Sequence, residues 1–453
     1  MMEERVREMK DSGIPWIGEI PKDWEIKPLK YVLNRRNEKN NPIKSKERLS
    51  LSIDIGITKY EDKTTNLDRF KDDFEQYQLA YPNDIVLNSM NMIVGAVGKS
   101  NYFGCVSPVY YVMTPSKESY PDYYGYLLNV PSIRKIYHKL GKGIYAIERG
   151  EGRVNTCRLK VSFNDFGRIN IPFPPIQEQK TIAEFLDRKC SEIDELVALQ
   201  DKMIEELKAY KQSIITETVT KGLNPNLPLK NSGIEWIGEI PQHWDVKPFK
   251  AVYSLGKGLT ITKADLVENG ISVISYGQIH SKSNSGTSIK DELIRYVPSI
   301  FIENNQNCLV NHGDVIFADT SEDLEGCGNC IFIDRDMLLF AGYHTIIAFN
   351  KSNYKNKYFS YLFKTDSWRT QLRTLVNGVK LYSIPQKTLS STYIIVPPLS
   401  EQQEIADYLD NKCSEIDSLI ELKQQKIEEL KDYKKSIIYE YVTGKKQVEI
   451  NEI

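Results

Sequence analysis

The chain of 453 residues has no run of about 20 apolar residues, so the sequence predicts no membrane-spanning helix. The segment Met1–Lys10 is charged and does not resemble a secretory signal. Cysteine is scarce: its seven residues are scattered and odd in number, which favours reduced thiols over a disulfide framework. These absences together indicate a cytoplasmic protein without disulfides.

The sequence also lacks the motifs of ATP-driven and methyl-transfer chemistry. Gly141-Lys-Gly143 is no phosphate-binding loop, so the chain is not expected to bind ATP. An adenine methyltransferase would carry a polar residue before a Pro-Pro pair, whereas Phe173-Pro-Pro-Ile176 and Val396-Pro-Pro-Leu399 begin with apolar residues. We therefore predict that this chain has no catalytic residue and binds no cofactor.

One cysteine pair invites a metal. Cys327-Gly-Asn-Cys330 has the spacing of paired zinc ligands, and His312 and His344 lie nearby in the sequence. The sequence holds no second pair at this spacing, and the first half of the chain has no counterpart. A glycine-containing turn with two free thiols is the favoured alternative, and we predict no metal site.

What the sequence does contain is an internal repeat. Ser12–Val32 and Ser232–Val252 share 14 identical residues in 21, and Pro174–Thr220 and Pro397–Thr443 share 29 in 47. A chain built from two similar halves carries an approximate two-fold axis. Such an axis suits a partner that is itself roughly dyadic, and duplex DNA is one.

The two segments between the repeated blocks, residues 26–171 and 245–396, have diverged and carry the positive charge. The first holds 23 Lys and Arg against 15 Asp and Glu, and the second 16 against 14, whereas the block 172–222 holds 7 against 10. The formal net charge of the whole chain is −2, which argues against indiscriminate binding of nucleic acid. A polyanion would therefore contact the variable segments.

Each repeat ends in a long helical pattern whose apolar residues follow a heptad spacing. Pro174-Pro175 and Pro397-Pro398 mark the helix starts, and Gly222 and Gly444 mark the ends. Two helices with matching seams are expected to pack as an antiparallel coiled coil, and two separate surface helices are the alternative. The seam residues are Leu186, Ile193, Val197, Ile204, Leu207 and Ile214 in the first helix, and Leu409, Ile416, Ile420, Ile427, Leu430 and Ile437 in the second.

The variable segments contain short runs of Tyr, Ile and Val broken by Gly and Asn, as mixed α/β domains do. We predict a mixed α/β (α+β) fold of two globular domains separated by two long helices, with Trp16, Trp24, Trp236 and Trp244 anchoring the repeated frame. The expected divisions are a repeat segment 1–25, a domain 26–171, a helical spacer 172–222, a linker with the second repeat segment 223–244, a domain 245–396, a helical spacer 397–444 and a tail 445–453.

The order of these blocks resembles the specificity subunit of Type I restriction-modification systems over nearly the whole chain. The resembling motifs are Trp16–Trp24 with its copy Trp236–Trp244, and Pro174-Pro-Ile-Gln-Glu-Gln179 with its copy Pro397-Pro-Leu-Ser-Glu-Gln402. The resemblance implies two target recognition domains that read the two halves of an interrupted DNA site. It also implies that the helices set the gap between the half-sites and dock partner subunits.

The resemblance further implies the partners and their cofactors. Two methyltransferase subunits and the restriction/translocase subunits would assemble with this noncatalytic chain on double-stranded DNA, and these partners would use S-adenosylmethionine, ATP and Mg. Two other functions stay open. The missing motifs count against a self-sufficient restriction or modification enzyme, and the basic variable segments count against a coiled-coil scaffold that binds proteins only.

The strongest nucleic-acid signal lies between residues 134 and 158, where Lys and Arg interleave with Tyr and Gly; a solvated loop is the alternative. Arginine can donate bidentately to guanine, and glycine lets the backbone approach phosphates. The second variable segment has a less basic counterpart, and three loops offer amides and hydroxyls that could instead cap the loops. The predicted DNA-binding residues are Arg134, Lys135, Lys139, Lys142, Tyr145, Arg149, Arg153 and Arg158, then Arg369, Arg373, Lys380, Tyr382 and Lys387, and in the loops Asn88, Asn91, Tyr276, Gln278 and Thr320.

Overall fold

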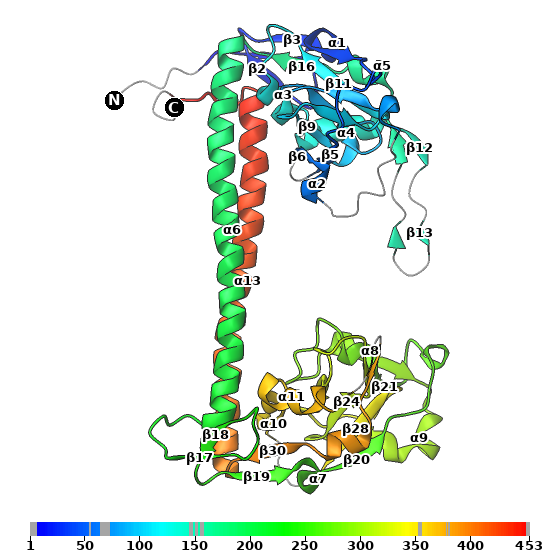
Figure 1. The fold of residues 1–453 in the computed structure, drawn as a ribbon, viewed down its shortest axis with the longest axis vertical. Coiled ribbons are helices and arrows are strands. Elements are labelled where there is room, and N and C mark those ends of the chain that lie inside the picture. Colours follow the sequence, from blue (N-terminus) through cyan, green and yellow to red (C-terminus); the bar gives the residue numbers. More distant parts are fainter. Residues whose placement is uncertain are drawn as a thin grey trace. The chain divides into compact units, whose positions relative to one another are not determined.

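The chain divides into two compact units in the computed structural model (Figure 1). Unit 1 comprises Met1–Asp201 and Gln424–Ile453, and unit 2 comprises Lys202–Lys423. Each unit holds one mixed α/β domain and a stretch of both long helices. The structure describes residues 7–53, 56–63, 73–144, 148–149, 153–154, 158–351, 356–376, 378 and 381–449.

The repeated sequence blocks form the same two strand pairs in each unit. The N–H of Lys22 donates to the carbonyl of Glu8, and the N–H of Gln242 donates to the carbonyl of Pro228, so the two copies correspond with an offset of 220 residues. The pairs are antiparallel. They are β1 (Met9–Asp11) with β2 (Glu19–Pro21), β3 (Glu25–Pro28) with β16 (Asn170–Phe173), β17 (Leu229–Asn231) with β18 (Glu239–Pro241), and β19 (Asp245–Pro248) with β30 (Tyr393–Val396).

A four-stranded antiparallel sheet of the same strand order lies in each domain, β4-β11-β8-β9 in unit 1 and β20-β28-β24-β26 in unit 2. A buried aspartate closes the turn into one strand of each sheet: Asp84 accepts the N–H of Tyr81, and Asp314 accepts the N–H of Asn311, both at 2.8 Å. The strands are β4 (Leu33–Arg36), β8 (Ile85–Asn88), β9 (Val97–Lys99), β11 (Tyr110–Pro115), β20 (Tyr253–Lys257), β24 (Val315–Ala318), β26 (Cys330–Phe332) and β28 (Thr345–Asn350).

The described part of unit 1 adds short helices and two-stranded pairs. The pairs are β5 (Leu49–Ser52) with β6 (Gly56–Lys59), β7 (Gln78–Ala80) with β10 (Gly104–Val106), β12 (Lys142–Ile144) with β15 (Arg158–Lys160), and β13 (Glu148–Arg149) with β14 (Arg153–Val154). The helices are α1 (Leu29–Val32), α2 (Tyr60–Lys63), η2 (Phe74–Gln76), η3 (Met92–Val94), α3 (Pro121–Leu127), α4 (Pro131–Leu140) and α5 (Phe163–Gly167).

Unit 2 adds a second four-stranded sheet. The two domains therefore share one four-stranded sheet but differ in the elements around it. The second sheet has the order β22-β21-β27-β23, and β25 pairs with β29. These strands are β21 (Ile271–Ile274), β22 (Arg295–Val297), β23 (Leu309–Val310), β25 (Thr320–Ser321), β27 (Leu339–Ala341) and β29 (Tyr382–Ser383). The helices are α7 (Phe249–Val252), η4 (Lys263–Asp265), α8 (Tyr276–Ile279), η5 (Asp291–Leu293), α9 (Phe301–Asn304), η6 (Gln306–Cys308), α10 (Tyr358–Leu362), α11 (Asp366–Arg373) and α12 (Gln386–Ser390).

Two long helices, α6 (Ile176–Lys221) and α13 (Leu399–Val442), pack on each other, and the predicted antiparallel coiled coil is confirmed. In unit 1, Lys434 pairs with Asp194 at 2.6 Å, and in unit 2, Lys211 pairs with Asp417 at 2.7 Å, which fixes the antiparallel direction. All twelve predicted seam residues are buried or partly buried. Packing of this apolar seam, rather than helix propensity, stabilises helices of such length.

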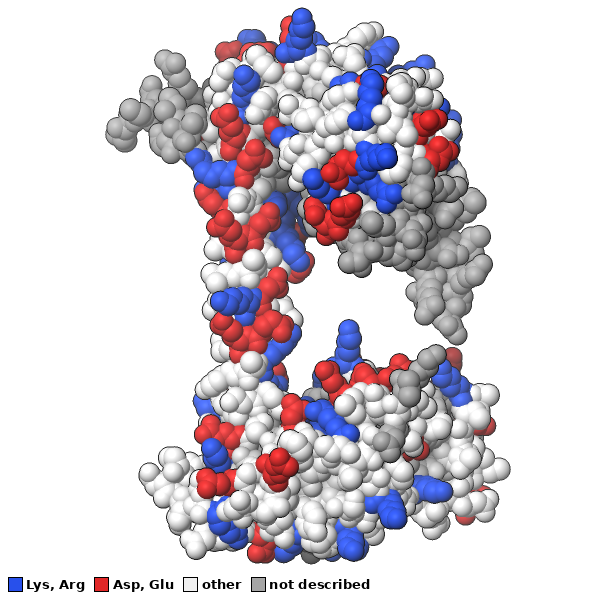
Figure 2. Space-filling model, in the orientation of Figure 1, with Lys and Arg blue, Asp and Glu red and all other residues white. Residues whose placement is uncertain are grey.

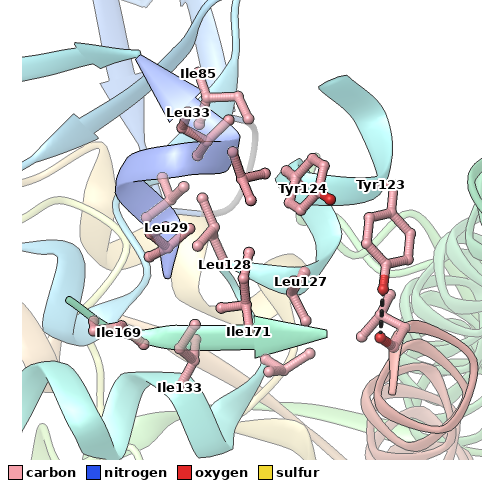
Figure 3. Packing of buried hydrophobic residues seen from close by; sticks show 14 of the residues in the cluster. Leu29, Leu33, Ile85, Tyr123, Tyr124, Leu127, Leu128, Ile133, Ile169 and Ile171 are labelled. Atoms are coloured by element: carbon pink, nitrogen blue, oxygen red, sulfur yellow. Dashed lines mark hydrogen bonds between the residues drawn. The ribbon is translucent and has the colours of Figure 1, made fainter. Parts of the chain in front are cut away.

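Each domain core continues onto the helix pair. Figure 3 shows aliphatic residues of α1, β8 and β16 meeting the tyrosines of α3, and the hydroxyl of Tyr123 pointing at α13. That hydroxyl donates to the carbonyl of Val442 at 2.7 Å, and in unit 2 the hydroxyl of Tyr358 donates to the carbonyl of Val219 at 2.8 Å. Among the described residues, no helix combines the length and apolarity that crossing a membrane requires.

The expectation for the repeated tryptophans is only partly correct. Trp24 and Trp244 are fully buried, but Trp236 is 45% exposed and does not anchor the frame. Its counterpart Trp16 packs against the unit 1 core, and the hydroxyl of Tyr439 donates to the Trp16 carbonyl. In the helix repeat, Thr216 takes the place of Tyr439 in unit 2, so the aromatic neighbour is missing there.

Candidate nucleic-acid interface

In unit 1 four of the predicted basic residues, Arg134, Lys135, Lys139 and Lys142, lie on α4 and β12. Lys135, Lys139 and Lys142 are exposed, as a contact with phosphate requires. Arg134 differs, because its guanidinium lies against Gly95, where φ is +103° and a Cβ would collide with it. Burial lowers the pKa of Arg134. Arg134 therefore supports the turn of η3 from behind, while the lysines face solvent.

The loop after β8 combines a structural amide and a free one. Asn88 accepts the N–H of Met90 at 3.1 Å, so it closes the loop. Asn91 is exposed and makes no side-chain capping bond at the start of η3. Of the two predicted amides, Asn91 is the more exposed to solvent.

The remaining predicted residues of unit 1 are placed by their backbone alone. Arg149 and Arg153 are register partners in the β13–β14 pair, and Arg158 is the register partner of Ile144 in the β12–β15 pair. Their side chains lie outside the described part of the structure, as does the whole of Tyr145. Their contact with DNA stays a prediction.

In unit 2 a cleft of about 650 Å³ opens beside α8 and β25. The predicted residues Tyr276 and Thr320 line it. So do carboxylates of the loop after β25, including Asp323 and Glu325. Carboxylates repel phosphate but accept a hydrogen bond from the exocyclic amino group of cytosine, so this cleft suits a base edge rather than the DNA backbone.

Two histidines that we did not predict as interface residues shape the cleft. The Nε2 of His280 lies 2.8 Å from the carbonyl of Thr320, and the Nδ2 of Asn329 lies 3.1 Å from the Nδ1 of His280. A carbonyl only accepts, so Nε2 carries the proton and Nδ1 accepts from the amide. These two bonds hold the imidazole ring in one orientation.

His344 forms the wall between this cleft and a neighbouring one of about 550 Å³. Its backbone is left-handed, with φ +55°, a conformation that costs a residue with a side chain about 1 kcal/mol or more. The ring meets the ring of Tyr276 edge to face, and its Nδ1 lies 3.3 Å from Oδ1 of Asp319. Neither contact is visible in the sequence, because the partners come from different loops.

Several other predicted residues of unit 2 have structural roles. The Oε1 of Gln278 accepts the N–H of Ser275 and so caps α8. Arg369 is partly buried and donates from Nε to the carbonyl of Phe363 at 2.8 Å, and burial lowers its pKa. Arg373 pairs with Asp366 at 2.7 Å.

The rest of the predicted set in unit 2 is more accessible. Lys387 is exposed on α12, and Tyr382 is partly exposed on β29, where its register partner Ser321 lines the cleft. Lys380 lies outside the described residues. The cleft thus brings together Tyr276 and Thr320, and Tyr382 pairs with a strand residue that lines it. Gln278, Arg369 and Arg373 instead hold the surrounding loops.

The cysteine pair Cys327 and Cys330 is buried. Burial raises the pKa of both thiols, that of Cys330 to about 11. Across the residues that the structure describes, no group of three or more His, Cys, Asp or Glu side chains is placed to hold a metal ion.

The repeated Pro-Pro-x-x-Glu-Gln motif has a structural role that the sequence did not indicate. Glu178 accepts the indole N–H of Trp24 at 2.8 Å, and Glu401 accepts that of Trp244 at 2.9 Å. Gln179 and Gln402 each donate to the carbonyl of the first proline of their motif. The motif therefore locks the start of each long helix to its strand frame, which positions the domain carrying the candidate interface.

Charge is mixed on the surfaces that surround these sites. Figure 2 shows acidic and basic side chains alternating along the helices, where pairs such as Lys189–Glu192 and Lys412–Glu415 form within one turn. Such exposed pairs contribute little stability. Because positive and negative charges are mixed, the face shown has no large basic surface, and attraction of DNA would depend on small groups of residues.

Comparison with known proteins agrees with the duplicated organisation. Residues 21–209 and 241–432 each match the family described as the Type I restriction modification DNA specificity domain. Over 286 residues the chain is 28% identical to the Type I restriction enzyme MjaVIII specificity subunit of Methanocaldococcus jannaschii, an alignment that covers 62% of this chain and 63% of that protein. It is 28% identical over 464 residues to the putative MjaX specificity subunit of the same organism, covering 95% and 96%.

More distant likenesses extend the comparison. The chain is 24% identical over 425 residues to the EcoKI specificity subunit of Escherichia coli K12, covering 89% of this chain and 84% of that one. A solved chain of a type I R-M system matches with a TM-score of 0.67 over 93% of this chain and 98% of that one, and the HsdS subunit of Thermoanaerobacter tengcongensis matches with 0.52 over 94% and 98%. Both structures are 15% identical to this chain, so they show a shared fold.

Proposed function

The chain belongs to the family of Type I restriction modification DNA specificity domains, and we propose that it is the DNA-reading subunit of a Type I restriction-modification complex. Each domain reads one half of a bipartite DNA site, and the helix pair α6–α13 sets the spacer between the half-sites. One observation carries the proposal: the same strand frame is built twice, but it supports a different surface in each unit. That surface is the basic helix α4 in unit 1 and the acidic cleft beside α8 in unit 2.

The proposed contacts divide by chemistry. In unit 1, Lys135, Lys139 and Lys142 neutralise phosphates and Asn91 reaches a base edge, together with Tyr145, Arg149, Arg153 and Arg158 as predicted from sequence. In unit 2, Tyr276, Thr320 and Tyr382 contact bases from the cleft, and Lys387 and Lys380 contact the backbone. Arg134, Arg369 and Arg373 act on DNA through the loops that they support.

The helix pair also offers two equivalent apolar surfaces for partner subunits. Leu196 and Leu199 of α6 are 46% and 51% exposed in unit 1, and their repeats Leu419 and Leu422 of α13 are 47% and 60% exposed in unit 2. Exposed apolar side chains repeated at one spacing mark a protein contact rather than chance. Two equivalent surfaces support two methyltransferase subunits, one on each copy.

Catalysis belongs to these partners in this proposal. The methyltransferase subunits bind S-adenosylmethionine, and the restriction/translocase subunits use ATP and Mg. The test is to incubate the purified chain with labelled S-adenosylmethionine and duplex DNA, with and without the methyltransferase subunits. We expect methyl transfer only in the full mixture, and transfer by the chain alone would favour a self-sufficient enzyme.

Domain exchange tests the reading role itself. Replacing residues 26–171 by the matching segment of a related specificity subunit should change one half of the methylated motif and leave the other half intact. Methylome sequencing of a host that expresses the hybrid with its methyltransferase gives the answer. Changes in both halves would show that the two domains read DNA jointly.

A further inference from the structure

The start of each long helix carries a carboxylate at the same place, and the partners of the two carboxylates differ. Among the described residues a guanidinium pairs with Glu178 only, whereas the imidazole of His243 contacts Glu401. Glu178 in unit 1 and Glu401 in unit 2 are repeat equivalents, and each uses Oε2 to accept an indole N–H from the frame. The remaining oxygen of each carboxylate faces the strand pair that precedes the domain. What lies in front of that oxygen differs between the units.

In unit 1 an arginine fills the position. Arg7 donates to both oxygens of Glu178, through Nη1 to Oε1 and through Nη2 to Oε2 at 2.9 Å. The same guanidinium donates to both oxygens of Asp23 at 2.9 Å and lies 5.6 Å from the ring centroid of Trp24. Two carboxylates and one indole therefore form a complete guanidinium site.

In unit 2 the equivalent position is apolar and a pocket opens instead. The strand register aligns Met9 with Leu229, so Leu227 takes the place of Arg7. The pocket has a volume of about 240 Å³. It is lined by Leu223, Asn224, Leu227, His243, Glu401, Glu404 and Ile405.

The pocket retains one carboxylate of the unit 1 site, loses the other and gains a new one. Glu401 and the Trp244 indole are retained, and Glu404 stands where unit 1 has Thr181. His243 replaces Asp23, and its Nε2 lies 2.6 Å from Glu401 Oε1. Within the described ranges of the chain, no lysine or arginine side chain pairs with Glu401.

We propose that this pocket binds an arginine side chain of a partner protein. Planar guanidinium matches a carboxylate in the bidentate way that Arg7 shows in unit 1, and a point-like ammonium does not. Leu223, Leu227 and Ile405 offer an apolar wall to the methylene stem of an arginine. The two carboxylates repel DNA phosphate, so the occupant comes from a protein. Its membership of the same complex rests on the proposed function, whereas the pocket itself does not.

The experiment uses the full chain with 15N-labelled tryptophan and N-acetyl-L-arginine amide as the probe. The indole N–H signal of Trp244 reports on Glu401, and that of Trp24 is the matched internal control because Arg7 already fills its site. We expect the probe to shift the Trp244 signal and leave the Trp24 signal in place, with a much smaller shift from N-acetyl-L-lysine amide. Equal shifts of both signals, or none of Trp244, would overturn the proposal.

Two variants exchange the properties of the sites. Leu227→Arg should fill the unit 2 pocket and abolish the Trp244 response, and Arg7→Ala should make Trp24 respond to the probe. Glu401→Gln keeps an acceptor for the indole but removes the charge, so it should weaken the Trp244 response at least tenfold. An unchanged response in Glu401→Gln or Leu227→Arg would contradict a guanidinium site.

The source of the arginine is tested on the assembled complex. Native mass spectrometry with methyltransferase subunits should show that Leu227→Arg and Glu401→Gln each weaken partner binding, while the sequence of both DNA half-sites is unchanged in methylation assays. Normal partner binding by both variants would refute a partner arginine even if the free amide binds. A changed half-site would instead point to failure of the proposed function, so the two failures are distinguishable.

Discussion

Single hydroxyl groups join each globular domain to the helix that ends beside it. Tyr358 is fully buried, and its hydroxyl donates to the carbonyl of Val219 in the last turn of α6. The last four carbonyls of a helix have no partner within the helix, so this bond satisfies one of them. The repeat places Tyr123 and Val442 in the same relation in unit 1.

We predict that Tyr358→Phe lowers the free energy of unfolding by about 1–3 kcal/mol, because the Val219 carbonyl stays buried without a donor. Tyr393→Phe is the control, since Tyr393 is 46% exposed. Urea denaturation of the two variants measures the difference. Equal stability of the two variants would show that water replaces the hydroxyl.

A lysine at the same junction makes stability depend on pH. Burial, aided by the charges of Lys211 and Arg369, lowers the pKa of Lys364 to about 8, while the thiols of Cys330 and Cys413 act in the opposite direction. Between pH 8 and about 10.4, the ordinary value for lysine, the unfolded chain therefore binds more protons than the folded chain. Stability contributed by this group rises with pH across that window.

We predict that Lys364→Met, which keeps the apolar stem, is more stable than the parent at pH 7. This stability advantage should shrink by about 1–3 kcal/mol as the pH is raised from 8 to 10. At the higher pH, keeping the lysine of the folded parent neutral costs less free energy. Denaturant midpoints of both proteins at several pH values provide the measurement. A constant difference across this range would mean that Lys364 is solvated in the folded protein.

At the scale of elements, the same helices serve two purposes on two faces. Their seam residues, such as Leu409, are buried, whereas Leu419 and Leu422 are exposed on α13. Apolar burial stabilises the pair by roughly 1.5–3 kcal/mol for each side chain fully removed from water. Exposed leucines contribute almost nothing to the isolated chain, so a different contact has to explain them.

We predict that Leu409→Ala destabilises the chain by about 2–5 kcal/mol, since it leaves a cavity in a packed core. The double variant Leu419→Ser with Leu422→Ser should change stability by less than about 1 kcal/mol but weaken binding of methyltransferase subunits. Thermal unfolding and subunit titration separate the two effects. Normal subunit binding by the double variant would remove the helix surface from the proposed docking site.

Helix α4 presents two exposed lysines, Lys135 and Lys139, that we propose bind phosphate. We predict that replacing Lys135 and Lys139 by glutamine weakens DNA binding and lowers the slope of log affinity against log salt by about 0.9 for each phosphate that is no longer neutralised. Lys180→Gln is the control, because this exposed lysine lies on α6. Fluorescence anisotropy at several salt concentrations tests this, and a parent-like slope in the double variant would place the interface elsewhere.

At the scale of the molecule, α6 and α13 each contribute residues to both units. The 46 residues of α6 correspond to a helix length of about 69 Å at 1.5 Å per residue. Because the pairs Asp194–Lys434 and Lys211–Asp417 fix the antiparallel register, a change of length in one helix alone would break the seam. Both helices have to be lengthened together.

We predict that four residues inserted within Leu199–Leu207 and four within Leu422–Leu430 enlarge the nonspecific gap of the DNA site. Four residues add about 6 Å of helix, which is one or two base pairs at about 3.4 Å each. The half-site sequences should stay the same. The methylated motif of the insertion variant gives the result, and an active variant with the original gap would exclude the helices as the spacer.

The repeat, the two long helices and their apolar seam follow from the sequence by itself. Heptad spacing and the Pro and Gly residues at helix ends depend only on residues that are close together in the chain. Two of the residues predicted to contact DNA, Tyr276 and Thr320, line the unit 2 cleft, and their contact with DNA stays a prediction. Local signals could not separate Arg369, which supports a loop, from exposed Lys387, because burial depends on segments distant in the chain.

Only the tertiary structure revealed why the repeated motifs matter. Glu178 and Glu401 stand in equivalent motifs, yet one binds Arg7 and the other faces an open pocket, since their neighbours come from strand pairs more than 150 residues away. The left-handed backbone of His344 between two clefts is likewise set by loops that meet only after folding. Sequence periodicity fixes local structure, and long-range packing decides which of two like residues becomes a site.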